Sequence, residues 1–334
     1  MSSTPRRILV TGGSGFIGTR LVEHLLAAGD TICNLDAAAP NLAEHTSLWQ
    51  HVDMLDADAV RDAVAAFGPT HVVHLAARVD TDSPVLNDYR VNFDGTANLL
   101  AALVDAPGLE RLVITSTQFV MRPGRLPVGD DDVDPHTAYG ESKVLAERLT
   151  READLPCTWT IVRPTNIWGP WHPRYPSEFW KVLEQGRYLH PRGRSPIRCY
   201  GYVANVVEQI ESILAAAPAR VHQRMFYLGD APAPLEEYVF GFARALTGKP
   251  PRTVPYGVLK TIALAGDAAQ KVGVRAPLTS SRLHSMTEDY PTPMGPTFAE
   301  FGAPSMSLAD GIAETVEWLR AGGVAQRAAT PAGR

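Results

Sequence analysis

The chain has 334 residues, of which 45% are hydrophobic and 20% charged, and its formal net charge is −5. These values are typical of a soluble globular protein with one large domain or two unequal domains. The 31 basic residues do not outnumber the 36 acidic ones, and no run of Lys or Arg marks a site for a polyanion. We therefore expect no nucleic acid as a partner.

The cysteines and the N-terminus indicate the compartment. Cys33, Cys157 and Cys199 are far apart and odd in number, which fits neither a metal site nor a disulfide framework and favours a reducing environment. The apolar run at residues 8–10 is too short for a signal peptide or a membrane span. We expect a cytoplasmic protein with no bound metal and no membrane partner.

The first half of the chain alternates short apolar runs with amphipathic segments. The runs that predict strands are 8–10, 31–35, 71–75, 111–114 and 158–162. The segments that predict helices are 16–28, 56–66, 87–104 and 139–152. This alternation is typical of an α/β fold with a doubly wound parallel sheet covered by helices on both faces.

A second, smaller and mostly helical lobe is expected from residue 166 to 321, after a first domain at 1–165. Prolines and aromatic residues become frequent there and strand-like runs become rarer. A helix at 202–217 and a strand at 225–228 are expected to return to the first domain. The apolar helix at 256–271 is too short to span a membrane, and its charged residues favour a place in the substrate lobe over a membrane surface. Residues 322–334 are expected to form a disordered tail.

A glycine-rich segment follows the first strand and opens the first helix. Gly12, Gly15 and Gly18 would permit a tight turn and a close approach of a pyrophosphate to a helix N-terminus. Asp36 ends the second strand, 18 residues after Gly18, where a carboxylate accepts hydrogen bonds from ribose hydroxyls and repels a 2′-phosphate. No Arg or Lys stands beside it, so NAD is favoured over NADP. Asp53, just after a third strand expected between the runs at 31–35 and 71–75, is a second candidate contact, with an ordinary loop carboxylate as the alternative.

Tyr139 and Lys143 are four residues apart at the start of a predicted helix, which places their side chains one turn apart on one face. An ammonium near a phenol stabilises the phenolate and lowers its pKa from about 10 toward the range of a general base. The spacing alone is common on helix surfaces. It becomes specific in combination with the glycine motif upstream.

Together these residues give the chain a resemblance to the extended short-chain dehydrogenase/reductases, in the NAD-dependent epimerase/dehydratase family. The matching residues are the glycine loop, His74-Leu75-Ala76-Ala77, Asn92, Thr115-Ser116-Thr117, Tyr139 with Lys143, and Arg163-Pro164-Thr165-Asn166-Ile167-Trp168-Gly169-Pro170. The resemblance implies a Rossmann domain, a small-molecule substrate, a homodimer, and catalysis by Thr117, Tyr139 and Lys143. The implied NAD-binding residues are Gly12, Gly15, Phe16, Ile17, Gly18, Asp36, Asp53, Met54, Leu75, Ala76, Ala77, Tyr139, Lys143 and Pro164. The implied substrate contacts are Thr117, Asn166, Arg198 and Arg282.

Structural roles compete with functional ones at four positions. Thr115 and Ser116 are expected to form hydrogen bonds at the strand end rather than to catalyse. Asn92 is expected to bind backbone near the active-site helices, and His74 to pack in the strand end.

The residues after Thr117 limit the chemistry. Family members that eliminate water have an Asp-Glu pair there, and decarboxylases have a glutamate, whereas this chain has Gln118 and Phe119. Both activities are therefore disfavoured. Met121-Arg122 replaces the aromatic residue and glycine usual in the family, and Asn205 replaces the usual acid before the second-lobe helix. These departures leave the identity of the substrate undetermined.

Three hypotheses follow. The first is an NAD-dependent nucleotide-sugar epimerase that acts at C4 through a transient keto-sugar. The second is a dehydrogenase or ketoreductase of a sugar or another cyclic secondary alcohol, and the third is a non-catalytic NAD-binding sensor. The complete set of Thr117, Tyr139 and Lys143 argues against the sensor, and release of free NADH would separate the first two.

Overall fold

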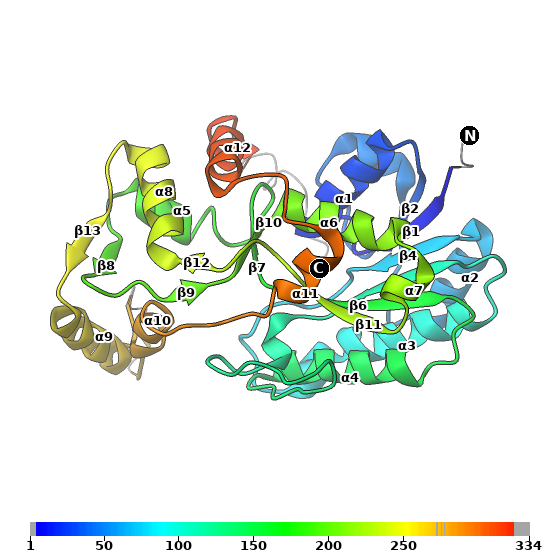
Figure 1. The fold of residues 1–334 in the computed structure, drawn as a ribbon, viewed down its shortest axis with the longest axis horizontal. Coiled ribbons are helices and arrows are strands. Elements are labelled where there is room, and N and C mark those ends of the chain that lie inside the picture. The colour runs from blue at the N-terminus through cyan, green and yellow to red at the C-terminus, as the bar shows by residue number, and fades with distance from the viewer. Residues whose placement is uncertain (1–4, 272, 275, 277, 324–334) are drawn as a thin grey trace.

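A parallel sheet of seven strands forms the larger lobe, and its strand order is β11-β6-β5-β4-β1-β2-β3 (Figure 1). The computed structural model describes residues 5–271, 273–274, 276 and 278–323; most of the expected tail, from residue 324 onward, lies outside them. The strands of this sheet are β1 (Arg7–Thr11), β2 (Thr31–Asp36), β3 (Trp49–His51), β4 (His71–His74), β5 (Arg111–Thr115), β6 (Thr158–Pro164) and β11 (Arg224–Leu228). The predicted doubly wound fold is confirmed.

Helices cover both faces of the sheet. Figure 1 shows α1 (Phe16–Ala27) and α6 (Val203–Ala215) on one face, and α2 (Ala57–Phe67), α3 (Arg90–Val104) and α4 (Ala138–Glu152) on the other. Because both faces are covered, the central strands are apolar throughout, and Ile8, Leu9 and Val10 are fully buried. Short 3-10 helices occupy Ala43–Leu48, Leu86–Tyr89 and Gln118–Val120.

The strand order reverses beside β1, which pairs with β2 on one side and with β4 on the other. Thr11 at the end of β1 is in register with Leu35 and with His74. The loops that follow β1 and β4 leave the sheet in opposite directions at such a point and open a crevice at the carboxyl ends of the strands. The fold therefore places a ligand crevice beside the glycine-rich segment.

The second lobe consists of short strands and helices beside this sheet (Figure 1). Its elements are β7 (Asn166–Trp168), α5 (Phe179–Glu184), β8 (Leu189–Pro191), β9 (Ile197–Arg198), β10 (Tyr200–Tyr202), β12 (Ala233–Pro234), α8 (Leu235–Thr247), β13 (Arg252–Val254), α9 (Tyr256–Lys271), α10 (Ser280–Ser285) and α12 (Leu308–Arg320). The short helices α7 (Pro218–Val221) and α11 (Gly295–Phe301) pack instead against β6 and β11 of the larger sheet. Aromatic rings form the core of the second lobe: Trp168 lies 5.3 Å from both Tyr238 and Phe242, centroid to centroid.

The helix expected at 256–271 is α9. No helix among the described residues is both long and apolar enough to cross a bilayer. Cys33, Cys157 and Cys199 are buried and form no disulfide.

Candidate active site

The glycine-rich loop is held tightly against the end of β4. Gly12 has a φ of 73°, and a Cβ at this position would lie only 2.6 Å from the backbone nitrogen of Ala76. Gly15 donates its backbone N–H to the Gly12 carbonyl at 3.0 Å, and a Cβ on Gly18 would overlap the same carbonyl. Larger residues would push the loop away from the sheet. The glycines thus keep the N-terminus of α1 close to the crevice.

Asp36 connects the end of β2 to this loop. Its carboxylate accepts hydrogen bonds from the backbone N–H of Ser14 at 3.0 Å and of Ala38 at 2.9 Å. Burial raises the pKa of Asp36, and these two hydrogen bonds oppose the shift. Each carboxylate oxygen has a further lone pair, so Asp36 can also accept from ribose hydroxyls.

A cavity of about 560 Å³, which we call the cofactor cavity, lies at the carboxyl ends of β1, β2 and β4. The residues that were expected at the cofactor and that line this cavity are Gly12, Gly15, Phe16, Asp36, Asp53, Met54, Leu75, Ala76 and Ala77. The expected residues Ile17, Gly18, Tyr139, Lys143 and Pro164 are not among the lining residues. The residues that sequence reasoning missed are Ser14, Ala37, Ala38, Ala39, Asn41, Val52, Arg78, Val91 and Trp171. Glycines, a carboxylate with lone pairs left to accept from a ribose, and a helix N-terminus together fit a dinucleotide.

Tyr139 lies in the first turn of α4, which Thr137 caps by accepting the backbone N–H of Gly140 at 3.0 Å. The Tyr139 side chain is buried, and burial raises the pKa of its phenol to about 12, while a hydrogen bond with the Thr117 side chain opposes the shift. The structure therefore brings Thr117 and Tyr139 together. A hydroxyl beside a phenol is the arrangement that holds a substrate oxygen for proton transfer.

Lys143 follows one turn later on the same helix. Its Nζ donates to the Thr115 carbonyl at 2.9 Å, and burial lowers the pKa of its ammonium to about 8. This hydrogen bond orients the ammonium toward the end of β5. Pro164 ends the neighbouring strand β6, and Asn166 begins β7.

A buried ion pair supports the helix that carries Tyr139. The Arg163 guanidinium donates twice to the Glu147 carboxylate, at 2.8 Å each, and both side chains are at least 96% buried. Glu147 also accepts from the Ser116 hydroxyl at 2.5 Å. Ser116 thus has a partner in α4, whereas the buried Thr115 hydroxyl has no partner among the described residues.

His74 is held within the strand end. Its Nδ1 lies 2.6 Å from the Thr11 hydroxyl and its Nε2 lies 3.0 Å from the Thr96 hydroxyl. Burial lowers the pKa of His74 to about 3, so the ring is neutral. Its two nitrogens are therefore occupied by structural hydrogen bonds.

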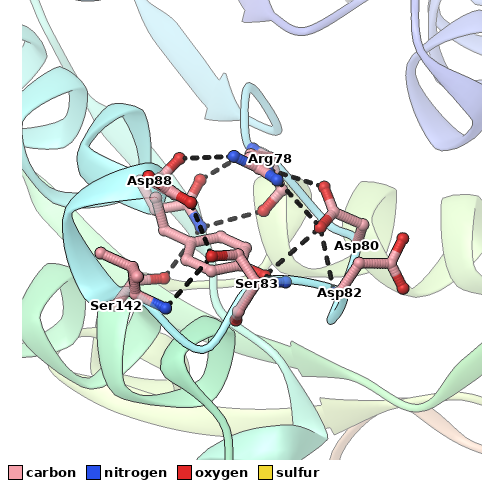
Figure 2. Close-up of polar contacts among 9 residues, drawn as sticks. Arg78, Asp80, Asp82, Ser83, Asp88 and Ser142 are labelled. Atoms are coloured by element: carbon pink, nitrogen blue, oxygen red, sulfur yellow. Dashed lines mark hydrogen bonds and ion pairs between the residues drawn. The ribbon is translucent and has the colours of Figure 1, made fainter. Parts of the chain in front are cut away.

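Asn92 fastens the loop that follows β4. It accepts from the backbone N–H of Arg78 at 2.8 Å, and it donates to the Arg78 carbonyl at 3.0 Å and to the Ser142 hydroxyl at 2.9 Å. Figure 2 shows the polar side chains of this loop gathered around Arg78, next to Ser142 of α4. Asn92 thereby connects the cofactor cavity to the helix of Tyr139.

A second cavity, of about 640 Å³, lies in the smaller lobe. Most of its lining is aromatic or aliphatic, including Phe179, Tyr188 and Tyr238. Two arginines, Arg187 and the expected Arg282, also line it. Arg187 was missed by sequence reasoning, because one arginine in a helical lobe carries no motif.

Arg198 does not line this cavity but lies beside it. Its guanidinium donates to the carbonyl of Ser285, which does line the cavity, and it sits over the Tyr290 ring at 5.9 Å. The Tyr290 hydroxyl in turn donates to the Gln118 carbonyl at 3.2 Å. Burial lowers the pKa of Arg198, and its buried Nε has no partner among the described residues.

The departures from the family pattern have structural roles. Asn205 donates to Asp230 at 2.7 Å and to the Met306 carbonyl at 2.9 Å. The Met121 carbonyl accepts from the Tyr290 hydroxyl at 2.8 Å. Arg122 pairs with Asp134 on the surface at 3.2 Å.

Comparison with known proteins agrees with this geometry. The model of the NAD dependent epimerase/dehydratase family matches residues 8–229. The chain is 34% identical over 230 residues to a 3 beta-hydroxysteroid dehydrogenase/Delta 5-->4-isomerase of Mycobacterium tuberculosis, which covers 63% of this chain and 60% of that protein. It is 32% identical over 209 residues to an N-acetyl-alpha-D-glucosaminyl-diphospho-ditrans,octacis-undecaprenol 4-epimerase of Escherichia coli O157:H7, which covers 61% of this chain and 62% of that protein. The chain thus spans about three fifths of the length of these two relatives.

Among solved structures, the chain is similar to the UDP-glucose 4-epimerase of Thermus thermophilus in complex with NAD. The TM-score is 0.69 and the identity 27%, and the match covers 94% of this chain and 98% of that chain. Both lobes therefore have counterparts in a structure that holds NAD. From its glycine loop to the end of β11, the chain belongs to the NAD-dependent epimerase/dehydratase family.

Proposed function

We propose that the protein is an NAD-dependent nucleotide-sugar epimerase that acts at C4 through a transient keto-sugar. Bound NAD supplies the acceptor and donor of the hydride. The Tyr139 phenolate takes the proton of the sugar hydroxyl as the hydride leaves the same carbon, and the resulting phenol gives the proton back when the hydride returns to the other face of the keto-sugar. Thr117 orients the substrate oxygen, and the Lys143 ammonium favours the phenolate and holds the nicotinamide ribose.

The observation that carries the nucleotide-sugar assignment is the position of Arg198. On one side its guanidinium donates to the carbonyl of Ser285, which lines the second cavity. On the other side it lies over the ring of Tyr290, whose hydroxyl forms a hydrogen bond with the carbonyl of Gln118, the residue after Thr117. If the base of the substrate lies in this cavity and its sugar lies at Tyr139, the diphosphate between them would lie next to the Arg198 guanidinium. A guanidinium offers paired donors to phosphate oxygens.

Binding of nucleoside diphosphates tests this proposal. We expect uridine, guanosine or thymidine diphosphate to bind the NAD-loaded protein with millimolar or tighter affinity in calorimetry. Arg198→Ala should weaken binding about tenfold or more, because a charge-assisted hydrogen bond contributes roughly 1.5–3 kcal/mol. Arg192→Ala is the control, since Arg192 is exposed in the same region and lines neither cavity. Equal binding by the Arg198 variant and the wild type would show that Arg198 does not bind the diphosphate, and would contradict the proposal.

A dehydrogenase or ketoreductase of a cyclic secondary alcohol is the second candidate. It is favoured by the mycobacterial relative, whose name describes a steroid dehydrogenase, and by the aromatic and aliphatic lining of the second cavity. The same Thr117, Tyr139 and Lys143 would serve both reactions. The two differ in whether the hydride leaves with the cofactor.

A further inference from the structure

Trp171 belongs to the second lobe but lines the cofactor cavity of the first. It follows β7 and Gly169, and it is among the lining residues together with Gly12, Gly15 and Phe16 of the glycine-rich segment. Figure 1 shows β7 between the two lobes. A segment of the second lobe therefore reaches across to the cavity where the pyrophosphate of a dinucleotide would lie.

The backbone of Trp171 has a conformation that side chains rarely adopt. Its φ is 70°, and among the described non-glycine residues only Gln223, with a φ of 59°, shares this left-handed region. For a bulky residue this conformation costs free energy and persists only where the surroundings impose it. The Trp171 side chain is buried, and its ring lies 5.5 Å from that of Trp318 in α12. Trp171 thus lines the cavity with a strained backbone and a buried side chain whose ring packs on Trp318.

His172 fastens the same segment to the glycine-rich loop. Its ring lies 5.0 Å from Phe16, the first residue of α1, and is stacked on Tyr175 at 3.8 Å. The His172 Nδ1 accepts the backbone N–H of Tyr175 at 3.0 Å. Helix α12 is joined to α1 by the ion pair of Arg20 with Glu314 at 3.2 Å. The segment itself, through His172, and the helix α12 that packs on Trp171 are thus both in contact with α1, the helix that begins at the cofactor cavity.

We propose that Trp171 and His172 form a closure over the NAD cavity, and that NAD cannot leave until this closure moves. The inference rests on the NAD binding in the proposed function and deepens it. An epimerase returns the hydride to the substrate from the same cofactor molecule, so retention of NAD serves that reaction. A dehydrogenase must exchange its cofactor after each turnover and would be slowed by such a closure.

The release rate of NAD tests the closure. The protein is loaded with radiolabelled NAD, chased with excess unlabelled NAD, and filtered at intervals. We expect the wild type to retain label for minutes or longer, and Trp171→Gly to release it at least tenfold faster. Glycine suits the left-handed backbone, so this variant removes the ring without new strain. Trp171→Phe should restore slow release, because it returns an aromatic ring to the wall.

Gln223→Gly is the matched control, since it relieves the same backbone conformation at an exposed position before β11. Its release rate should equal that of the wild type. Complete exchange by the wild type within seconds overturns the closure, whether or not any variant folds. Equal release by the wild type and a folded Trp171→Gly variant also overturns it. Failure of the wild type to bind NAD at all would instead contradict the proposed function.

Discussion

At the scale of single residues, burial opposes the charged forms of the two side chains proposed for catalysis, Tyr139 and Lys143. Burial raises the pKa of Tyr139 to about 12 and lowers that of Lys143 to about 8. Both shifts disfavour a phenolate beside an ammonium in the protein alone. Because a nearby positive charge lowers the pKa of a phenol, oxidised NAD would favour the phenolate. The base is therefore expected to form mainly in the loaded enzyme.

Replacement of Tyr139 by Phe separates chemistry from binding. We expect turnover to fall by about 10²–10⁴, the usual contribution of general acid–base catalysis, because only the phenolic hydroxyl is lost. The affinity for NAD should stay within about twofold, since Tyr139 does not line the cofactor cavity. Steady-state rates and cofactor titration measure the two effects. A variant with near wild-type turnover would exclude Tyr139 as the acid/base.

Asp36 is expected to set the preference for NAD. In Asp36→Ala, NADH should bind about tenfold more weakly, because a hydrogen-bond acceptor for the ribose is lost. NADPH should bind as well as before or better, because the charge that repels its 2′-phosphate is removed. Fluorescence titration with both cofactors measures this change. An unchanged ratio of the two affinities would refute the assigned role, and Asp36→Asn tests the charge alone.

At the scale of elements, the Glu147–Arg163 pair joins α4 to β6 inside the protein. Glu147→Ala leaves a buried guanidinium without its carboxylate, which typically costs about 3–5 kcal/mol of unfolding free energy, so we expect a loss of that size. Urea denaturation of the two proteins measures it. The double variant Glu147→Leu with Arg163→Met should lose less, because neither charge remains. A single variant as stable as the wild type would show that the pair is dispensable.

Sequence reasoning found the elements with a strong periodic pattern. All five expected strand runs of the first half lie within or next to β1, β2, β4, β5 and β6, because central parallel strands are continuous apolar runs. The paired strands of the second lobe have only two or three residues each. A run that short carries no periodicity, so these strands could not be predicted.

Candidate site residues could be proposed from the sequence where a motif lies within one segment. Gly12, Asp36 and Tyr139 have local signals that follow from turn geometry, strand ends and helix spacing. Arg78 and Trp171 line the cofactor cavity but reach it only through folding, since Trp171 comes from the other lobe. No local pattern at either position distinguishes a cavity residue from an ordinary surface or core residue.

At the scale of the molecule, contacts between the lobes assemble the site. The Tyr290 hydroxyl of the second lobe lies within hydrogen-bond distance of the carbonyls of Gln118 and Met121, in the loop that follows Thr117. Arg198, stacked over Tyr290, lies between the second cavity and this loop. The proposed substrate would therefore contact both lobes at once, with its sugar at the larger lobe and its nucleotide at the smaller one.

The fate of the hydride tests the central proposal most directly. The NAD-loaded protein is incubated with a panel of nucleotide sugars while the sugar epimers are quantified by chromatography and free NADH by its absorbance. The proposal predicts that at least one nucleotide sugar is converted to its C4 epimer with no NADH accumulating in solution. Formation of one NADH for each ketone formed, or turnover of a cyclic alcohol but of no nucleotide sugar, would contradict it and establish the dehydrogenase alternative.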